Sequence, residues 1–330
     1  LFKPSELLNK LVAEGKLGKK SGKGVANVFG ATLLPGVCVF QQLAPVSSIS
    51  SIRDVAIIGT GTMGCGIAQT VAESRMNVML VGRSEASLRR AVASINRFVK
   101  VIAKKELGLD KLAQDKLVDE VSKRITTTTS LQKAVAEADL VIEAVIERLD
   151  VKRELFQRIE SASKSRTLLA TNTSSLRLSE ISVNLQRKRN FGGLHFFNPV
   201  RMMKLLEVVR CAETSPETLK AFLAFGKALG KEAIECTDKP GFIVNRILVS
   251  SICESLKILE AGDASMKQID TAMRLGASHP MGPFQLISFI GVDTFKTILQ
   301  SLHEAYPDDA RFGCIELLNK MIDEGKFSAG

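Results

Sequence analysis

Between residues 53 and 237, short apolar runs alternate with longer amphipathic stretches. The runs have the continuous apolar character of strands buried on both faces, and the stretches repeat apolar positions at helical spacing. The predicted strands are 55–58, 77–81, 125–128, 140–145 and 168–170, and the predicted helices include 84–105, 112–121, 131–137 and 151–162. Strands that alternate with helices indicate an α/β domain built on a parallel sheet.

The strand pattern stops at the turn signal Thr237-Asp238-Lys239-Pro240-Gly241. Beyond it, apolar residues from Val244 to Leu259 fall at helical spacing. Further helices are expected at 266–275, 284–290, 294–304 and 315–324. The sequence therefore predicts an α/β domain over 53–237 and an all-α domain over 238–330 that is truncated at its end.

Residues 1–52 form a separate N-terminal extension in this prediction. Nine of its first sixteen residues recur 310 positions later, in the order Phe2, Glu6-Leu7-Leu8-Asn9-Lys10 and Glu14-Gly15-Lys16. Such an offset favours tandem units, with this stretch as the tail of a preceding unit. Residues 25–51 contain no charged residue and several Gly, Pro and Ser, which is typical of a linker. A decayed targeting leader is the alternative, although the Arg residues that such leaders favour are missing.

Composition narrows the class of protein. The chain has 330 residues, 45% hydrophobic and 24% charged, with no apolar run long enough to span a membrane. A net charge of +10 suits an anionic ligand, but no Trp and one Tyr argue against nucleic acid as a partner. Six cysteines without a C-x-x-C pair predict a reducing compartment, the mitochondrial matrix or the cytoplasm, and no metal site.

A glycine motif follows the first predicted strand. Gly59, Gly61 and Gly64 have G-x-G-x-x-G spacing and lead into a helix that begins with Thr62 and Met63. In such a motif the first glycine permits a tight turn, the second admits a pyrophosphate, and the third allows close packing of helix and strand. Because strand, turn and helix occur in the required order, these five residues predict a Rossmann dinucleotide site.

The second predicted strand ends in Val81-Gly82-Arg83-Ser84. An acidic residue at this point accepts the ribose 2′-hydroxyl of NAD, which Gly82 cannot do. Arg83 suits the 2′-phosphate of NADP instead. The alternative is that Arg83 is a solvated loop residue and that NAD still binds, so we expect NAD as cofactor with NADP possible.

Polar residues follow the next strands of the predicted sheet, where the ligand crevice of a Rossmann fold lies. Glu147 and Lys152 come after the strand 140–145 and are candidates for the nicotinamide end of the cofactor, although a solvated ion pair is the alternative. Thr171-Asn172-Thr173-Ser174-Ser175 follows the strand 168–170. Its hydroxyls suit the capping of a helix and equally a hydrogen bond to a substrate oxygen.

The candidate chemistry lies in a histidine and a carboxylate. His195 stands at a strand end among apolar residues, and Glu207 lies twelve residues further on a second apolar stretch. Two polar groups in such surroundings are plausible partners, because unpaired burial of a charge is costly. A carboxylate that orients an imidazole makes a base, which suits removal of a hydroxyl proton as hydride leaves the adjacent carbon.

Four sequence motifs together resemble the 3-hydroxyacyl-CoA dehydrogenase family. They are Gly59-x-Gly61-x-Met63-Gly64-x-Gly66-Ile67-Ala68, Asn172-Thr173-Ser174-Ser175, His195-Phe196-Phe197-Asn198-Pro199 and Pro240-Gly241-Phe242-Ile243-Val244-Asn245-Arg246. The resemblance covers about residues 53 to 330, and residues 1–24 resemble the tail of the family. It implies reversible oxidation of a 3-hydroxyacyl-CoA to the 3-ketoacyl-CoA, as in fatty-acid β-oxidation, by a homodimer.

The resemblance also implies roles for single residues. His195 matches the catalytic base of the family and Glu207 its orienting carboxylate, while Ser174 and Asn245 match positions that hydrogen-bond the substrate. Ser174 and Asn198 match positions near the nicotinamide, Glu147 and Lys152 match cofactor contacts, and Lys105 matches a coenzyme A contact. Substrate carbon and nicotinamide must be held face to face for hydride transfer, which requires such positioning groups.

The chain departs from the family pattern at several positions. Gly82 replaces the usual acidic residue, and Gln285 and Ser288 stand where Glu and Asp are common. Two alternatives therefore remain: an NADP-linked 3-hydroxybutyryl-CoA dehydrogenase that works toward reduction, and a catalytically idle relative with a structural or binding role.

Overall fold

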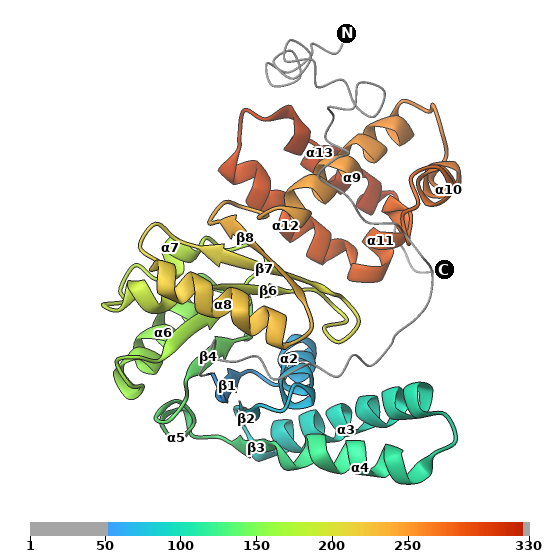
Figure 1. Ribbon diagram of the computed structural model, residues 1–330. Helices are drawn as coiled ribbons and strands as arrows, with labels where there is room; N and C mark the ends of the chain where they lie inside the picture. The colour runs from blue at the N-terminus through green and yellow to red at the C-terminus, as the bar shows by residue number, and fades with distance from the viewer. Residues whose placement is uncertain (1–51, 326–330) are drawn as a thin grey trace, which may run out of the picture. The chain divides into compact units, whose positions relative to one another are not determined.

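The computed structural model describes residues 52–325 (Figure 1). The predictions of a tail-like repeat and linker before residue 52 lie outside the described residues, as does the prediction of a truncated end after residue 325.

An eight-stranded sheet forms the first part of the described chain, in the order β3-β2-β1-β4-β5-β6-β7-β8. The strands are β1 (Asp54–Ile58), β2 (Asn77–Val81), β3 (Ile125–Thr128), β4 (Leu140–Glu143), β5 (Leu168–Thr171), β6 (Phe191–Phe196), β7 (Leu205–Arg210) and β8 (Glu232–Thr237). Strands β1 to β6 pair in parallel, and β7 is antiparallel to β6 and parallel to β8. The order reverses between β1 and β4, which is where a doubly wound sheet binds its ligand.

Helices connect the strands and cover the sheet. They are α2 (Thr62–Glu73), α3 (Glu85–Leu107), α4 (Lys111–Lys123), α5 (Leu131–Val135), α6 (Leu149–Ala162), α7 (Leu178–Ile181), the short η3 (Lys188–Asn190) and α8 (Pro216–Ala228). Successive side chains of β1 point to opposite faces. Val55 and Ile57 belong to a core with residues of α2, α3 and α8, and Ala56 and Ile58 to a second core with residues of α5, α6 and α7.

Every element after β8 is helical within the described residues: α9 (Val244–Glu260), α10 (Met266–Gly276), α11 (Pro283–Ile290), α12 (Val292–Ala305), η4 (Ala310–Phe312) and α13 (Ile315–Asp323). These helices share their own buried core, which includes Ile252, Leu256 and Leu299. The prediction of an α/β Rossmann fold followed by an all-α part is confirmed.

Several details differ from the sequence prediction. The sequence prediction did not include α8 and β8. Strand β8 lies at the edge of the sheet and carries Glu232 and Glu235, so it lacks the continuous apolar character of the buried strands. Cys253 and Cys314 form a disulfide between α9 and the turn before α13, which no spacing motif predicts. Within residues 52–325, no helix is both long and apolar enough to cross a membrane.

Candidate active site

Gly59, in the turn after β1, and Gly64, in the first turn of α2, leave no room for a side chain. Gly59 has φ +127°, and a Cβ atom there would lie 2.3 Å from the carbonyl oxygen of Ala144 on the neighbouring β4 segment. A Cβ atom at Gly64 would lie 2.0 Å from the carbonyl oxygen of Gly59. Any side chain at either position would therefore force the backbone of β1, β4 or α2 apart, which the tight turn does not allow.

Gly61 differs, because a Cβ atom there would meet no atom within 4 Å. Among residues 52–325, no acceptor takes the backbone N–H groups of Thr62, Met63 and Gly64 at the start of α2. Open space over a glycine beside unpaired N–H groups at a helix N-terminus suits the pyrophosphate of a dinucleotide. The turn therefore fits the cofactor that the motif predicts.

The end of β2 lies beside this turn, because the backbone N–H of Gly59 donates to the carbonyl oxygen of Val81 at 3.0 Å. Gly82 is buried, and the exposed Arg83 that follows it forms no ion pair or hydrogen bond among the described residues. The first side chain after Gly82, at the end of the strand beside the glycine turn, is therefore a guanidinium without a partner among the described residues.

A buried group of charges lies beyond the end of β4. Lys152 in α6 is 1% exposed, and its Nζ lies 2.6 Å from Glu143 Oε1 and 3.2 Å from Glu147 Oε2. Glu143 is fully buried and also accepts hydrogen bonds from the Val145 N–H and the Thr171 hydroxyl, both at 2.7 Å. The alternative of a solvated ion pair at Lys152 is wrong, because Glu143 and Glu147 enclose its ammonium.

Glu147 holds the loop that follows β5. One of its oxygens accepts hydrogen bonds from the hydroxyl of Thr173, the N–H of Ser174, and the N–H and hydroxyl of Ser175. Burial alone would raise the pKa of Glu147, but the Lys152 ammonium and these hydrogen bonds lower it below its ordinary value. The carboxylate is therefore ionised at neutral pH, and it fixes the backbone on which Ser174 stands.

His195 and Glu207 face each other across the antiparallel pair β6 and β7. His195 Nδ1 lies 2.7 Å from Glu207 Oε2, and the two side chains are 6% and 0% exposed. Since a carboxylate only accepts, the Nδ1–H donates to it, and Nε2 remains as the nitrogen that can accept a proton.

The second oxygen of Glu207 connects this pair to the helical part. Oε1 accepts the N–H groups of Ile243 and Val244 at 3.1 and 3.0 Å, at the start of α9. The next residue, Asn245, donates from Nδ2 to the carbonyl oxygen of Ser174 at 3.4 Å. His195, Glu207, Ser174 and Asn245 are thus brought together from β6, β7, the loop after β5 and α9.

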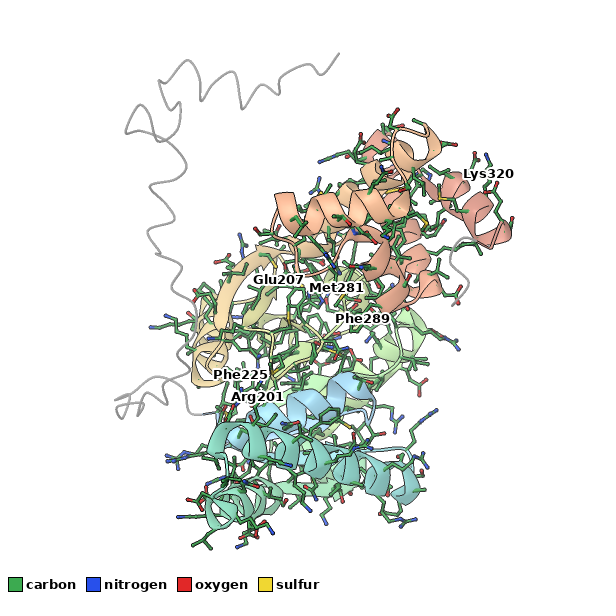
Figure 2. The ribbon with its side chains drawn as sticks, turned by 90° about the vertical axis from the view of Figure 1, so that its right-hand side faces the viewer. Arg201, Glu207, Phe225, Met281, Phe289 and Lys320 are labelled. Carbon is green, nitrogen blue, oxygen red and sulfur yellow. A yellow bond between two sulfur atoms is a disulfide. The ribbon has the colours of Figure 1, made fainter. Side chains whose placement is uncertain are left out.

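The loop that carries Asn198 is held in place by a buried lysine. Lys231 Nζ donates to the carbonyl oxygens of Val200 and Met203, each at 2.7 Å. Burial and the charge of Arg201 lower the pKa of Lys231 to about 8. Arg201, labelled in Figure 2, forms ion pairs with Glu73 of α2 and Glu106 of α3.

Lys105 precedes Glu106 in α3 and is exposed. Because Arg201 contacts Glu106 at 3.1 Å, the end of α3 that carries Lys105 lies next to the loop that follows Asn198. Lys105 itself forms no hydrogen bond or ion pair with His195 or Ser174 among the described residues. It is placed at the margin of the site and not in its centre.

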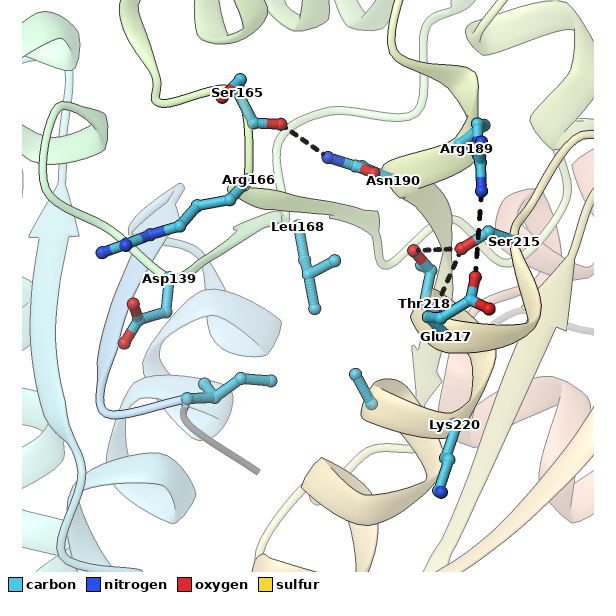
Figure 3. A pocket seen from close by; sticks show the side chains of 12 residues that line it. Asp139, Ser165, Arg166, Leu168, Arg189, Asn190, Ser215, Glu217, Thr218 and Lys220 are labelled. Carbon is cyan, nitrogen blue, oxygen red and sulfur yellow. Dashed lines mark hydrogen bonds and ion pairs between the residues drawn. The ribbon is translucent and has the colours of Figure 1, made fainter. Parts of the chain in front are cut away.

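A separate cavity of about 930 Å³ lies elsewhere on the sheet (Figure 3). Its lining includes Asp139, Leu168 and Asn190, which stand at the amino ends of β4, β5 and β6. His195, Glu147 and Ser174 lie at the opposite, carboxyl ends of the strands. Since ligands of such sheets bind outside the carboxyl ends, this cavity is not the candidate active site.

The sequence prediction assigned no individual role to three positioning residues. Glu143 holds Lys152, Lys231 holds the loop after Asn198, and Asn172 accepts the Phe196 N–H at 3.0 Å through its Oδ1. A charged residue inside the apolar run Leu140-Val141-Ile142-Glu143 was the available signal for the first. Within residues 52–325, no cluster of His, Cys, Asp or Glu has the arrangement of a metal site.

Comparison with protein families gives two matches. Residues 54–239 match the NAD-binding domain of 3-hydroxyacyl-CoA dehydrogenase, and residues 241–330 match its C-terminal domain.

Individual relatives agree with this match. A probable 3-hydroxyacyl-CoA dehydrogenase of Caenorhabditis elegans is 49% identical over 286 residues, which cover 87% of this chain and 93% of the relative. The mitochondrial hydroxyacyl-coenzyme A dehydrogenase of Sus scrofa is 42% identical over 84% of this chain and 88% of its own. The crystal structure of (S)-3-hydroxybutyryl-CoA dehydrogenase from Ralstonia eutropha has a TM-score of 0.78 at 36% identity and covers 83% of this chain and 95% of its own.

Proposed function

The chain belongs to the 3-hydroxyacyl-CoA dehydrogenase family and carries its NAD-binding domain, and from this premise we propose that His195 is the base of its reaction. The reaction interconverts a 3-hydroxyacyl-CoA and NAD⁺ with the 3-ketoacyl-CoA and NADH, as in fatty-acid β-oxidation. One observation carries the proposal: the His195 imidazole lies 2.7 Å from the buried carboxylate of Glu207.

His195 takes the proton of the substrate 3-hydroxyl on Nε2. The hydrogen bond from Nδ1–H to Glu207 fixes the tautomer that leaves Nε2 free to accept, and the carboxylate stabilises the positive charge that the ring then acquires. The bound nicotinamide supplies the acceptor for the hydride that leaves the same carbon. In the reverse direction, His195 returns the proton to the developing alkoxide.

Ser174 and Asn245 hold the substrate oxygen in this proposal. Both side chains come from segments that are fixed by carboxylates, Ser174 by Glu147 and the start of α9 by Glu207. Donors held in advance at the reacting oxygen stabilise its developing charge without reorganisation. Together with Asn198, Ser174 also borders the nicotinamide.

Glu147 and Lys152 act on the cofactor side of the site. Their mutual contact at 3.2 Å and the hydrogen bonds of Glu147 to residues 173–175 support a role in shaping the nicotinamide pocket. Lys105 supplies an exposed ammonium for a phosphate of coenzyme A, which a cation at the margin of the site suits.

The chain works as two units in this proposal. Residues 53–237 bind the dinucleotide, and residues 238–330 supply Asn245 and the dimer interface. Leu275 in α10 and Phe289 in α11, the latter labelled in Figure 2, are 74% and 60% exposed, and a second copy of the chain would cover such apolar residues. Light scattering after size exclusion should give a mass of two chains. The Phe289→Asp variant should give the mass of a single chain.

For its compartment we propose the mitochondrial matrix. The supporting observation is that the relatives from Sus scrofa and Homo sapiens are named mitochondrial. Fractionation of cells that express the full chain should place it with matrix markers. Recovery with cytosolic markers would contradict this assignment.

The activity is tested with purified chain, acetoacetyl-CoA and NADH, by the loss of NADH absorbance. Turnover that His195→Gln reduces by about two orders of magnitude or more supports the proposal. No turnover with either NADH or NADPH, while the chain is folded, would favour a catalytically idle relative.

A further inference from the structure

The residue that follows β2 decides which dinucleotide a Rossmann fold prefers. An acidic side chain there accepts the ribose 2′-hydroxyl of NAD, while an arginine accommodates the 2′-phosphate of NADP. In this chain the position is occupied by Gly82, 21 residues after Gly61, and is followed by Arg83.

The structure has no free space for a side chain at position 82. A Cβ atom at Gly82 would lie 2.8 Å from both Leu88 Cδ2 and Ser87 Oγ. Leu88 is a core residue with 1% exposure, and Ser87 is held by the capping box of α3, where its hydroxyl donates to the Ser84 carbonyl at 2.7 Å. Arg83 is therefore the first residue after β2 that presents a side chain to the ribose.

Arg83 is available to a ligand. It is exposed, and none of the described residues forms an ion pair or hydrogen bond with its guanidinium. Residues 82–90 carry three arginines, Arg83, Arg89 and Arg90, and one carboxylate, Glu85, so the net charge of this stretch is +2. This balance favours a dianionic group over a neutral hydroxyl.

The turn also lies where the adenosine ribose must pass. The hydrogen bond from the Gly59 N–H to Val81 keeps the end of β2 beside the glycine turn, where the pyrophosphate fits. A ligand that extends from this turn over the end of β2 reaches residues 82–84 with its ribose.

We propose that the turn Gly82-Arg83-Ser84 binds a 2′-phosphate, so that this chain accepts NADP(H) at least as tightly as NAD(H). The inference rests on the proposed function, because it takes the glycine turn as the dinucleotide site. The guanidinium of Arg83 forms charge-assisted hydrogen bonds to the phosphate oxygens, and no carboxylate at position 82 repels them.

Adenosine fragments test the site without catalysis. Calorimetric titration of the full chain should show that adenosine 2′,5′-bisphosphate binds about tenfold or more tightly than 5′-AMP. Arg83→Gln should reduce this preference by about ten- to a hundredfold and leave the affinity for 5′-AMP unchanged. Equal affinity of the two fragments for the unaltered chain would overturn the inference.

Arg97→Gln is the matched control. Arg97 is exposed on α3, about 18 Å along the helix axis from Glu85. Arg97→Gln therefore changes the net charge as much as Arg83→Gln does, but at a distance beyond the screening length. The preference for the bisphosphate should survive in this variant. If Arg97→Gln and Arg83→Gln weakened it equally, the general charge of the protein and not Arg83 would be responsible.

Steady-state rates separate this inference from the proposed function. With acetoacetyl-CoA, kcat/KM for NADPH should equal or exceed that for NADH, and Arg83→Gln should reverse the order. Turnover with NADH alone overturns the inference and leaves the proposed function intact. Selective binding of the bisphosphate without turnover by either cofactor supports the inference and overturns the proposed function.

Discussion

His195 and Glu207 are direct partners in the antiparallel pair of β6 and β7, and their side chains meet at 2.7 Å. The same carboxylate receives two N–H groups from the start of α9 with its other oxygen. One buried side chain therefore orients the base and also positions the helix that carries Asn245.

His195→Gln should reduce turnover by about two to four orders of magnitude, the usual contribution of a general base. The amide keeps the size of the side chain but cannot take up the hydroxyl proton. NADH affinity, measured by fluorescence titration, should change little. An equal loss of cofactor affinity and turnover would mean that His195 is structural.

Glu207→Gln should lower both turnover and stability. The amide still accepts hydrogen bonds, but it removes the negative charge that stabilises protonated His195 and weakens the contacts to Ile243 and Val244, at a cost of roughly 1–3 kcal/mol. The measurements are kcat and the midpoint of urea unfolding. Lower kcat with unchanged stability would contradict the dual role of Glu207.

Local pattern was enough to predict the glycine turn, because Gly59, Gly61 and Gly64 act within one strand, turn and helix. The pairing of His195 with Glu207 was only a hypothesis from the sequence, since the register of β6 and β7 depends on pairing across a connection. The predicted strand at 140–145 ends at Glu143, whose side chain then binds the N–H of Val145.

Long-range burial was beyond the sequence. Lys152 near the start of an amphipathic helix is typical of a solvated residue, and only the fold places Glu143 of β4 and Glu147 around it. The role of Lys231 could not be predicted for the same reason. Its acceptors are the backbone carbonyl oxygens of Val200 and Met203, which no side-chain pattern reveals.

The contact between Glu143 and Lys152 should show strong energetic coupling. Lys152→Met leaves two carboxylates without their cation and should cost about 3–5 kcal/mol of unfolding free energy. Glu143→Gln should cost less unfolding free energy than Lys152→Met. The loss in the double variant should be about 1–3 kcal/mol smaller than the sum of the losses in the two single variants.

The control for this cycle is the exposed pair Glu154 and Arg158 in α6, whose closest atoms are 3.9 Å apart. The cycle Glu154→Gln and Arg158→Met should show no measurable coupling, because solvent screens exposed charges. Additive effects at Glu143 and Lys152 would contradict the buried ion pair.

Glu147 should contribute stability that depends on pH. The pKa of Glu147 is lower in the folded protein than its ordinary value of 4.5. Between these two pKa values, the unfolded chain therefore binds more protons than the folded protein. The contribution is complete above pH 4.5 and is lost as the pH falls through the lower, folded value. The Tm difference between the unaltered chain and Glu147→Gln should therefore be largest at neutral pH and shrink in acid.

The control is Glu154→Gln, at a site that is 75% exposed, which should give a small Tm difference at every pH. A Tm difference for Glu147→Gln that does not change with pH would contradict the prediction.

Alanine at Gly59 and at Gly61 should separate folding from cofactor binding. Gly59→Ala places a methyl group 2.3 Å from the Ala144 carbonyl at a φ of +127°, so it should cost more than about 2 kcal/mol of unfolding free energy. Gly61→Ala meets no atom within 4 Å and has a φ of −76°, so its stability should stay within about 1 kcal/mol of the unaltered chain.

The cofactor affinity of Gly61→Ala should nevertheless fall by about tenfold or more, because its methyl group occupies the space through which the pyrophosphate approaches the backbone. Urea unfolding and NADH titration on the same preparations give the two quantities. If Gly61→Ala bound NADH as tightly as the unaltered chain, the open space over Gly61 would not be the pyrophosphate site, and the orientation of the cofactor along β2 would have to be assigned anew.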